Sequence, residues 1–136
     1  MNPINQDEII SIMEEDRAKL VLEDYFNTKL IKTDKYHPMD FIDEQSNYYE
    51  IKSRRNNYNR YNTTMITANK IKFCKRDSTK QYYFVFCFSD GDYIYHYNSK
   101  DYFEFGLGGR TDRGIDEIKQ YCYIPINLLK KIEINI

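Results

Sequence analysis

Apolar side chains recur at helical spacing near the start of the chain and in short runs or alternation further along. Over residues 7–26 the apolar positions lie three or four residues apart, which predicts a long helix. Three stretches rich in aromatic and β-branched residues follow it at 29–33, 39–43 and 48–54, and they predict three strands. A polar break between the last two of these strands predicts a hairpin.

The middle of the chain is predicted to hold a second helix and a buried strand. The polar segment 56–62 has the composition of a loop. Thr63 or Thr64 then offers an N-cap, which predicts a helix running to about residue 75. The run 81–88 is almost continuously apolar and aromatic, as expected for a central strand covered on both faces.

The remaining part of the chain alternates turns with short elements. The predicted elements are, in order, a turn at 89–91, a strand at 93–97, a long loop at 106–114, a strand at 118–124 and a short final helix at 128–132. The order of helix, three strands, helix and further strands predicts an α/β fold with a mixed central sheet flanked by helices. The length of 136 residues predicts a single domain over residues 1–136.

Composition narrows the class of protein without identifying it. Hydrophobic residues make up 41% and charged residues 30%, and the net charge is −1, as in an ordinary globular protein. Three scattered cysteines without CxxC spacing argue against a disulfide framework or a zinc knuckle. A reducing, intracellular location in cytoplasm or nucleus is expected, because we see no secretory leader or membrane span. Abundant Asn, Lys, Ile and Tyr indicate an AT-rich source, such as a virus or a low-GC bacterium.

Two carboxylates and an amine fall on the predicted hairpin. Asp40 lies on its first strand, and Glu50 and Lys52 lie on its second. Side chains alternate between faces along a strand, so Glu50 and Lys52 point the same way and Ile51 points the other. Hard carboxylate oxygens suit Mg²⁺, which takes one or two protein carboxylates and keeps several waters. This pattern predicts a metal site formed by Asp40 and Glu50, with the Ile51 carbonyl as a third ligand.

The length of the turn decides which aspartate reaches the site. A connection of odd length, or a bulge, places Asp40 on the same face as Glu50. A regular four-residue turn at 44–47 would place Asp43 there instead. Asp43 is therefore the rival ligand, and the sequence leaves this choice open. An exposed salt bridge between Asp40 and Lys52, with no function, is the simplest alternative to a metal site.

The segment His37-Pro38-Met39-Asp40 followed by Glu50-Ile51-Lys52 resembles the signature of the PD-(D/E)XK nuclease superfamily. One extra residue separates the proline from the aspartate, while the Glu-x-Lys half matches without alteration. The resemblance extends by element order over about residues 7–90. It implies a restriction-endonuclease-like αβββαβ core and a metal-dependent nuclease. The metal is expected to be Mg²⁺, with Mn²⁺ as a substitute.

The resemblance also implies roles for further residues. Lys52 would orient the attacking water or neutralise charge that builds on the phosphate. An acidic residue of the first helix often joins the site in this superfamily; Glu14 is the preferred candidate, with Glu15 and Glu23 as alternatives. A polar residue of the second helix often assists, and Lys70 fills that position.

Basic and aromatic residues after the hairpin suggest a substrate-binding segment. The candidate phosphate and base contacts are Arg54, Arg55, Tyr58, Arg60, Arg110 and Arg113. Together these features predict an endonuclease that hydrolyses DNA phosphodiester bonds through a Mg²⁺-activated water. A homodimer that cuts two strands fits a nuclease of this size. The alternative is a catalytically inactive nucleic-acid-binding module of the same fold, acting within a larger complex. A third interpretation is an interaction protein that does not bind nucleic acid.

Overall fold

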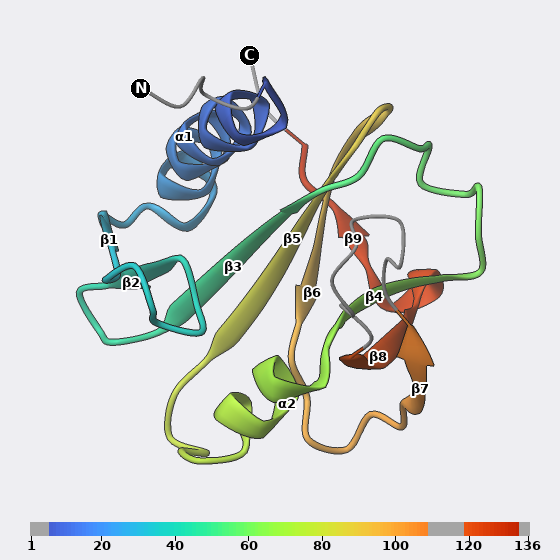
Figure 1. Ribbon diagram of the computed structural model, residues 1–136. Coiled ribbons are helices and arrows are strands. Elements are labelled where there is room, and N and C mark those ends of the chain that lie inside the picture. The colour runs from blue at the N-terminus through green and yellow to red at the C-terminus, as the bar shows by residue number, and fades with distance from the viewer. Residues whose placement is uncertain (1–5, 109–118, 134–136) are drawn as a thin grey trace, which may run out of the picture.

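The structure is a computed structural model that describes residues 6–108 and 119–133 (Figure 1). Its elements are α1 (Gln6–Phe26), β1 (Leu30–Lys32), β2 (Phe41–Asp43), β3 (Tyr48–Ser53), β4 (Thr63–Thr67), α2 (Ala68–Cys74), β5 (Tyr82–Phe88), β6 (Gly91–His96), β7 (Glu104–Gly108), β8 (Lys119–Pro125), the 3-10 helix η1 (Ile126–Leu128) and β9 (Lys130–Lys131). The first helix and the first three strands confirm the predicted elements to within a few residues. The described part of the chain contains no helix long and apolar enough to cross a membrane.

The strands form two sheets. The central sheet has the order β1-β2-β3-β5-β6-β9, and the smaller sheet has the order β4-β8-β7. In the central sheet β3 and β5 run parallel, whereas the other neighbours are antiparallel, so the sheet is mixed as predicted. The crossover from β3 to β5 contains β4 and α2, which brings the smaller sheet over one face of the central sheet.

Each face of the central sheet has its own hydrophobic core. Phe84 and Phe86 of β5 pack on the side of α2 and the smaller sheet. Val85 and Cys87 alternate with them and pack under α1, together with Leu22 of that helix. Both faces of β5 are therefore covered, which confirms the prediction of a buried central strand. Figure 1 shows α1 on one side of the sheet, and α2 with the smaller sheet on the other.

The predicted start of the second helix is wrong. Residues Thr63–Thr67 form β4, which pairs with β8, and α2 begins only at Ala68. Four of the five residues of β4 are β-branched, and such residues favour extended backbone when a partner strand is available. Thr67 precedes α2 in an extended conformation, but its side chain makes no capping hydrogen bond to the helix backbone.

Two predictions near the end of the chain also need correction. The predicted glycine-rich loop begins as a strand, because Glu104–Gly108 pair with β8; the rest of that loop lies outside the described residues. A Cβ at Gly106 would lie 3.1 Å from the ring of Tyr123, so the glycine allows this tyrosine to cross the strand. In place of the predicted final helix, η1 turns the chain into β9, which pairs with β6. Burial of Leu129 and Ile132 on the central sheet favours this extended ending.

Candidate active site

The turn between β2 and β3 determines which acidic residue lies opposite Glu50. The Asp43 N–H donates to the Asn47 carbonyl at 2.9 Å, so the turn encloses three residues rather than four. Ser46, inside this turn, adopts the left-handed region with φ 62°. The odd length continues the register of the hairpin so that Asp40 comes opposite Glu50.

Hydrogen bonds hold Asp40 at the point where β2 and β3 separate. Its N–H donates to the Tyr49 carbonyl at 2.9 Å, and its Oδ2 accepts from the Ile51 N–H at 2.8 Å. Asp40 is thus bonded to the residues on both sides of Glu50. The N–H and C=O of one strand residue point to the same edge, so the Ile51 carbonyl also points toward Asp40.

The rival aspartate, Asp43, stabilises the turn. Its Oδ1 accepts from the N–H groups of Gln45 and Asn47, each at 2.9 Å, and its Oδ2 accepts from the Tyr49 hydroxyl at 2.8 Å. Burial, together with this hydrogen bond, raises the pKa of Tyr49. The structure therefore does not place Asp43 beside Glu50, and its oxygens are already occupied.

Glu50 is the most deeply buried acidic side chain of the described residues, at 2% exposure. It lies on the face of β3 that α2 covers, where the Lys70 Nζ approaches its Oε2 to 2.6 Å. This contact is an ion pair by distance, but it lacks the geometry of a hydrogen bond, and Oε2 has no hydrogen-bond partner. Lys70 instead donates a hydrogen bond to the Pro38 carbonyl.

The environment of Glu50 favours its neutral form. Burial raises its pKa to about 8; the hydrogen bond and the charge of Asp40 act in the same direction, while Lys52 and Lys70 oppose the shift. A pair of adjacent carboxylates resists full ionisation unless a cation compensates it. Two adjacent carboxylates, one of them buried with an oxygen that lacks a hydrogen bond, fit a divalent cation with a preference for oxygen ligands. The residues present therefore suit the predicted Mg²⁺.

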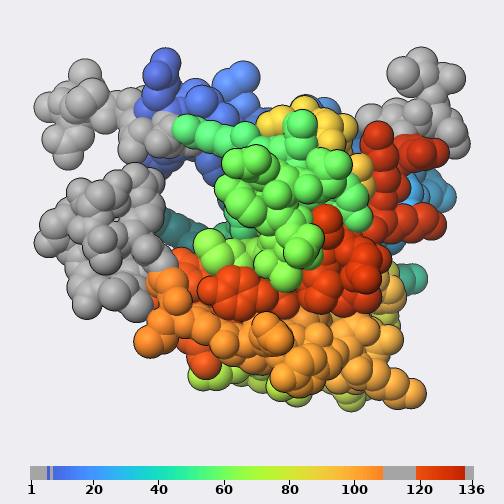
Figure 2. All heavy atoms as spheres, turned by 90° about the vertical axis from the view of Figure 1, so that its right-hand side faces the viewer, coloured from blue at the N-terminus to red at the C-terminus, as the bar shows by residue number. Residues whose placement is uncertain are grey.

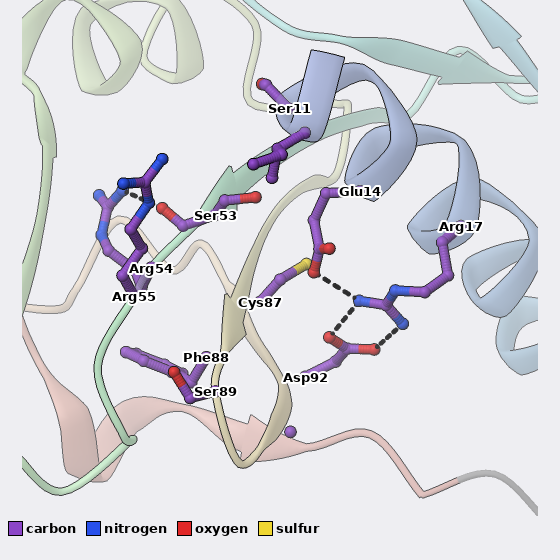
Figure 3. Close-up of a pocket in the computed structure, with 12 residues that line it drawn as sticks. Ser11, Glu14, Arg17, Ser53, Arg54, Arg55, Cys87, Phe88, Ser89 and Asp92 are labelled. Atoms are coloured by element: carbon purple, nitrogen blue, oxygen red, sulfur yellow. Dashed lines mark hydrogen bonds and ion pairs between the residues drawn. The ribbon is translucent and has the colours of Figure 1, made fainter. Parts of the chain in front are cut away.

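The structure does not bring Glu14 to this site. Glu14 lies on the α1 side of the central sheet, whereas Glu50 faces α2. Arg17 donates to Glu14 at 2.8 Å and to both oxygens of Asp92 at 2.8 Å, and the three side chains line a cavity of about 840 Å³ beside Cys87 (Figure 3). These bonds raise the pKa of Arg17.

The two alternatives to Glu14 are also engaged elsewhere. Glu15 forms an ion pair with Lys32, and the Glu23 Oε2 accepts from the Leu30 N–H at 2.9 Å. Glu14 lies four residues before the buried Ala18, on the side of α1 that faces the sheet. The spacing of residues along a helix does not show which face of the sheet the helix covers. Because α1 covers the face opposite to α2, the sheet separates Glu14 from Glu50.

Arg54 lies at the end of β3 and connects it to β4. Its Nε donates to the Thr64 hydroxyl at 3.3 Å, its Nη2 donates to the Met65 carbonyl, and its guanidinium lies 5.5 Å from the ring centroid of Phe86. Burial lowers the pKa of Arg54. These contacts give Arg54 a structural role in addition to any contact with substrate.

The segment between β3 and β4 lies against the β5–β6 turn and η1, and Figure 2 shows green atoms of this part of the chain beside the red atoms of its C-terminal part. The Tyr58 ring stacks on Tyr93 at 4.0 Å, and its hydroxyl donates to the Ile126 carbonyl at 2.9 Å. Tyr58 is thus packed into the protein rather than presented for stacking on a base. Arg55 and Arg60 are exposed, as a phosphate-binding role requires.

Arg110 and Arg113 fall outside the described residues, so their predicted phosphate contacts remain predictions. Sequence reasoning missed the strand β4, although its β-branched residues carry the signal. Lys70, which the resemblance implies as the assisting residue of the second helix, lies against Glu50.

The comparison with protein families gives one match. Residues 11–132 match the model of a family described as "Phage putative PDDEXK endonuclease". No curated protein matches the chain. The matched residues extend from α1 to the end of the described chain and include the whole hairpin, which confirms the resemblance and the α/β fold class.

Proposed function

The chain belongs to the PD-(D/E)XK endonuclease family, and we propose that it is a Mg²⁺-dependent endonuclease that hydrolyses DNA phosphodiester bonds. The observation that carries this proposal is the placement of Asp40 opposite Glu50, whose buried Oε2 lacks a hydrogen bond. Mn²⁺ would substitute for Mg²⁺, because it accepts the same oxygen ligands.

Asp40 and Glu50 would hold the ion, with the Ile51 carbonyl as a third ligand from the same strand edge. When bound, Mg²⁺ would polarise a phosphate oxygen and lower the pKa of a coordinated water. Asp40 is already oriented by the Ile51 N–H, which reduces the rearrangement that binding requires. Burial of Glu50 keeps bulk water away from that carboxylate.

Lys52 lies two residues beyond Glu50 on the same face of β3, and its charge opposes the upward pKa shift of Glu50. In the proposed reaction Lys52 orients the attacking water or stabilises the negative charge that develops on the phosphate. Lys70 of α2 holds the Glu50 carboxylate through the ion pair at 2.6 Å. Removing Lys52 should therefore reduce turnover more than it reduces metal binding.

The exposed residues Arg55 and Arg60 would contact backbone phosphates, and Arg54, which is bonded to Thr64 of β4, would support them from the end of β3. Arg110 and Arg113 are retained as further proposed contacts. A homodimer would allow two such sites to cut both strands of a duplex. Size exclusion with light scattering, with and without DNA, measures this property directly.

The decisive experiment is cleavage of labelled linear, nicked, branched and single-stranded DNA with Mg²⁺, Mn²⁺ or EDTA. We expect Glu50→Gln and Lys52→Ala to reduce cleavage by about 10²-fold or more, since each removes a group at the reacting centre. Glu14→Gln is the matched control, because it removes a carboxylate on the other face of the sheet, and it should leave cleavage within about twofold. Thermal melts establish that each variant folds.

Metal-dependent cleavage that survives Glu50→Gln would refute the assigned site. A wild-type protein that binds DNA without cutting any substrate would favour the catalytically inactive binding module. Loss of cleavage in Glu14→Gln, with folding intact, would show that the α1 face takes part in the reaction.

A further inference from the structure

A small pocket opens beside the segment that joins β3 to β4. It has a volume of about 290 Å³ and is lined mainly by aromatic and apolar side chains, among them Tyr58, Tyr61, Met65, Phe88 and Tyr123. Ligand sites in proteins commonly have volumes of roughly 300–1,000 Å³. This pocket lies at the lower end of that range, so it suits one small, flat ring system rather than an extended ligand. We refer to it as the tyrosine pocket.

The rings of the tyrosine pocket differ in how firmly the protein holds them. Tyr58 and Phe88 form an edge-to-face pair with centroids 5.9 Å apart, and Tyr58 also stacks on Tyr93. Tyr61, by contrast, is 59% exposed, and Met65 is 38% exposed. An exposed aromatic ring beside a packed aromatic wall offers its face to a ligand that can stack on it.

Basic groups lie at the rim of the tyrosine pocket. The Arg60 guanidinium lies 5.6 Å from the centroid of the Tyr61 ring, and Arg54 is one of the lining residues. Asp90 and Glu104 are neighbours of lining tyrosines, but among the described residues no carboxylate lines the pocket itself. These surroundings fit a ligand that carries both a flat ring and a negative charge.

The backbone beside the pocket is not open to a further strand. β4 is an edge strand of the smaller sheet, and the Arg54 Nη2 donates to the Met65 carbonyl on its free edge. Peptides that bind by strand addition need such backbone groups to be available. Side chains rather than backbone groups therefore recognise the ligand of this pocket, which favours a nucleobase over a peptide strand.

Arg54 connects the tyrosine pocket with the strand that carries the candidate active site. Lys52 pairs with Phe86 of β5, and the Arg54 guanidinium lies 5.5 Å from the ring centroid of Phe86, so Arg54 continues the face of β3 that holds Glu50 and Lys52. The four residues from Glu50 to Arg54 rise by about 13 Å. This distance corresponds to about four phosphates of one DNA strand at about 3.4 Å per charge.

We propose that the tyrosine pocket binds one unpaired nucleobase of a DNA substrate, with the Tyr61 ring stacked on the base. This inference rests on the proposed function, because it takes DNA to be the substrate of the candidate site. Stacking on an aromatic ring tolerates every base, so the pocket recognises an unpaired nucleotide rather than a sequence. The preferred substrates are therefore DNAs with an extrahelical base, a branch or a single-stranded stretch, since a paired base must first leave its stack at a cost in free energy.

The test is the affinity for labelled DNA in EDTA, where cleavage is prevented, measured by fluorescence anisotropy over a range of salt concentrations. Three duplexes of one sequence are compared: fully paired, with one extra unpaired base, and with an abasic nucleotide in place of that base. The variants are Tyr61→Ala, which removes the ring, and Tyr61→Phe, which keeps it. Tyr102→Ala is the matched control, because Tyr102 is 82% exposed and does not line the pocket.

We expect the wild type to bind the duplex with the unpaired base about tenfold more tightly than the abasic duplex, because base–aromatic stacking contributes on that order. Tyr61→Ala should lose this preference, whereas Tyr61→Phe and Tyr102→Ala should keep it within about threefold. The affinity of Tyr61→Ala for the fully paired duplex should change by less than about twofold. Its salt slope should stay at the wild-type value, since a tyrosine neutralises no phosphate.

The loss caused by removing the ring and the loss caused by removing the base must not add, because the two groups form one contact. Tyr61→Ala should therefore bind the abasic duplex as the wild type does, and additive losses would overturn the pocket. A preference that survives Tyr61→Ala, or that Tyr102→Ala loses equally, would overturn it as well. Thermal melts establish that each variant folds. The wild type alone provides a test without any variant, since equal affinity for the unpaired base and the abasic nucleotide would also refute the inference.

Cleavage in Mg²⁺ separates this inference from the proposed function. A wild type that shows the Tyr61-dependent preference but cuts no DNA would refute the nuclease and retain the pocket. Cleavage of paired and unpaired duplexes with equal kcat/KM, unaffected by Tyr61→Ala, would retain the nuclease and refute the pocket. A wild type that neither binds nor cuts DNA would refute both.

Discussion

The two helices cover opposite faces of one sheet and differ in charge. Helix α1 is long and acidic; its charged residues are Asp7, Glu8, Glu14, Glu15, Asp16, Arg17, Lys19, Glu23 and Asp24. Helix α2 has seven residues, contains two lysines and no acidic residue, and continues into Lys75 and Arg76. The difference in charge between the two helices therefore favours the approach of a polyanion to α2 over its approach to α1.

The acidic residues on the two faces also differ in how they are satisfied. On the α1 side Glu14 and Asp92 share Arg17, Glu15 pairs with Lys32, and Glu23 accepts a backbone N–H. On the α2 side the Oε2 of the buried Glu50 has no hydrogen bond. Several acids on the α1 side are thus held by ion pairs or a backbone N–H, whereas on the α2 side Glu50 pairs with Lys70 but keeps an Oε2 without a hydrogen bond, next to the carboxylate of Asp40.

The largest effect on stability should come from the apolar packing of α1 on the central sheet. Two leucines of α1 differ fully in exposure: Leu22 is 0% exposed and Leu20 is 67% exposed. We expect Leu22→Ala to lower the free energy of unfolding by about 2–5 kcal/mol, because it leaves a cavity. Leu20→Ala should cost less than about 0.5 kcal/mol. Urea unfolding measures both, and equal costs would show that α1 is not packed as described.

The next effect concerns the buried carboxylate of Glu50 on the α2 face. The pKa of Glu50 is raised to about 8 from an ordinary 4.5, so the folded protein binds an extra proton between these values. In EDTA, stability should therefore fall as the pH rises from about 5 to 8, by at most about 1.4 kcal/mol per pH unit. Glu50→Gln should remove this part of the pH dependence.

Urea unfolding at several pH values, for wild type and Glu50→Gln, measures the difference between them and cancels the other titrating groups. Added Mg²⁺ should stabilise the wild type most at pH 8, where Glu50 loses its proton most readily, by about 2.7 kcal/mol at a concentration 100 times Kd. A wild type whose pH profile parallels that of Glu50→Gln would contradict the burial argument.

Much of the candidate site could be predicted from sequence because the signals are local. Alternation within β3 places Glu50 and Lys52 on one face, and the Glu-x-Lys spacing identifies them. The turn length, which decides between Asp40 and Asp43, depends on hydrogen bonds that Asp43 makes within the turn and with Tyr49. The sequence shows that the choice between Asp40 and Asp43 depends on the turn length, but only the observed register of β2 and β3 decides it.

The features that sequence reasoning missed depend on distant partners. Residues Thr63–Thr67 carry both a helix-capping signal and strand propensity, and β8, more than fifty residues later, selects the strand. Tyr58 lies among arginines and therefore resembled a base-stacking residue. In the structure its ring stacks on Tyr93 and its hydroxyl donates to the Ile126 carbonyl. Likewise, Glu14 was expected at the active site, but α1 covers the face of the sheet away from Glu50.

The smallest expected effect tests whether the α1 face is purely structural. Arg17 holds Glu14 and Asp92 together, but its side chain is 45% exposed, so solvent and salt screen these ion pairs. We expect Arg17→Met to lower the free energy of unfolding by about 1 kcal/mol at 50 mM salt and by less at 500 mM. DNA cleavage should stay within about twofold of wild type, because the substitution leaves Asp40, Glu50 and Lys52 unchanged. Urea unfolding at both salt concentrations and kcat/KM on a duplex substrate measure the two properties on the same protein. A cleavage loss of tenfold or more with folding intact would mean that the α1 face contributes to the reaction, and it would return Glu14 to the active site.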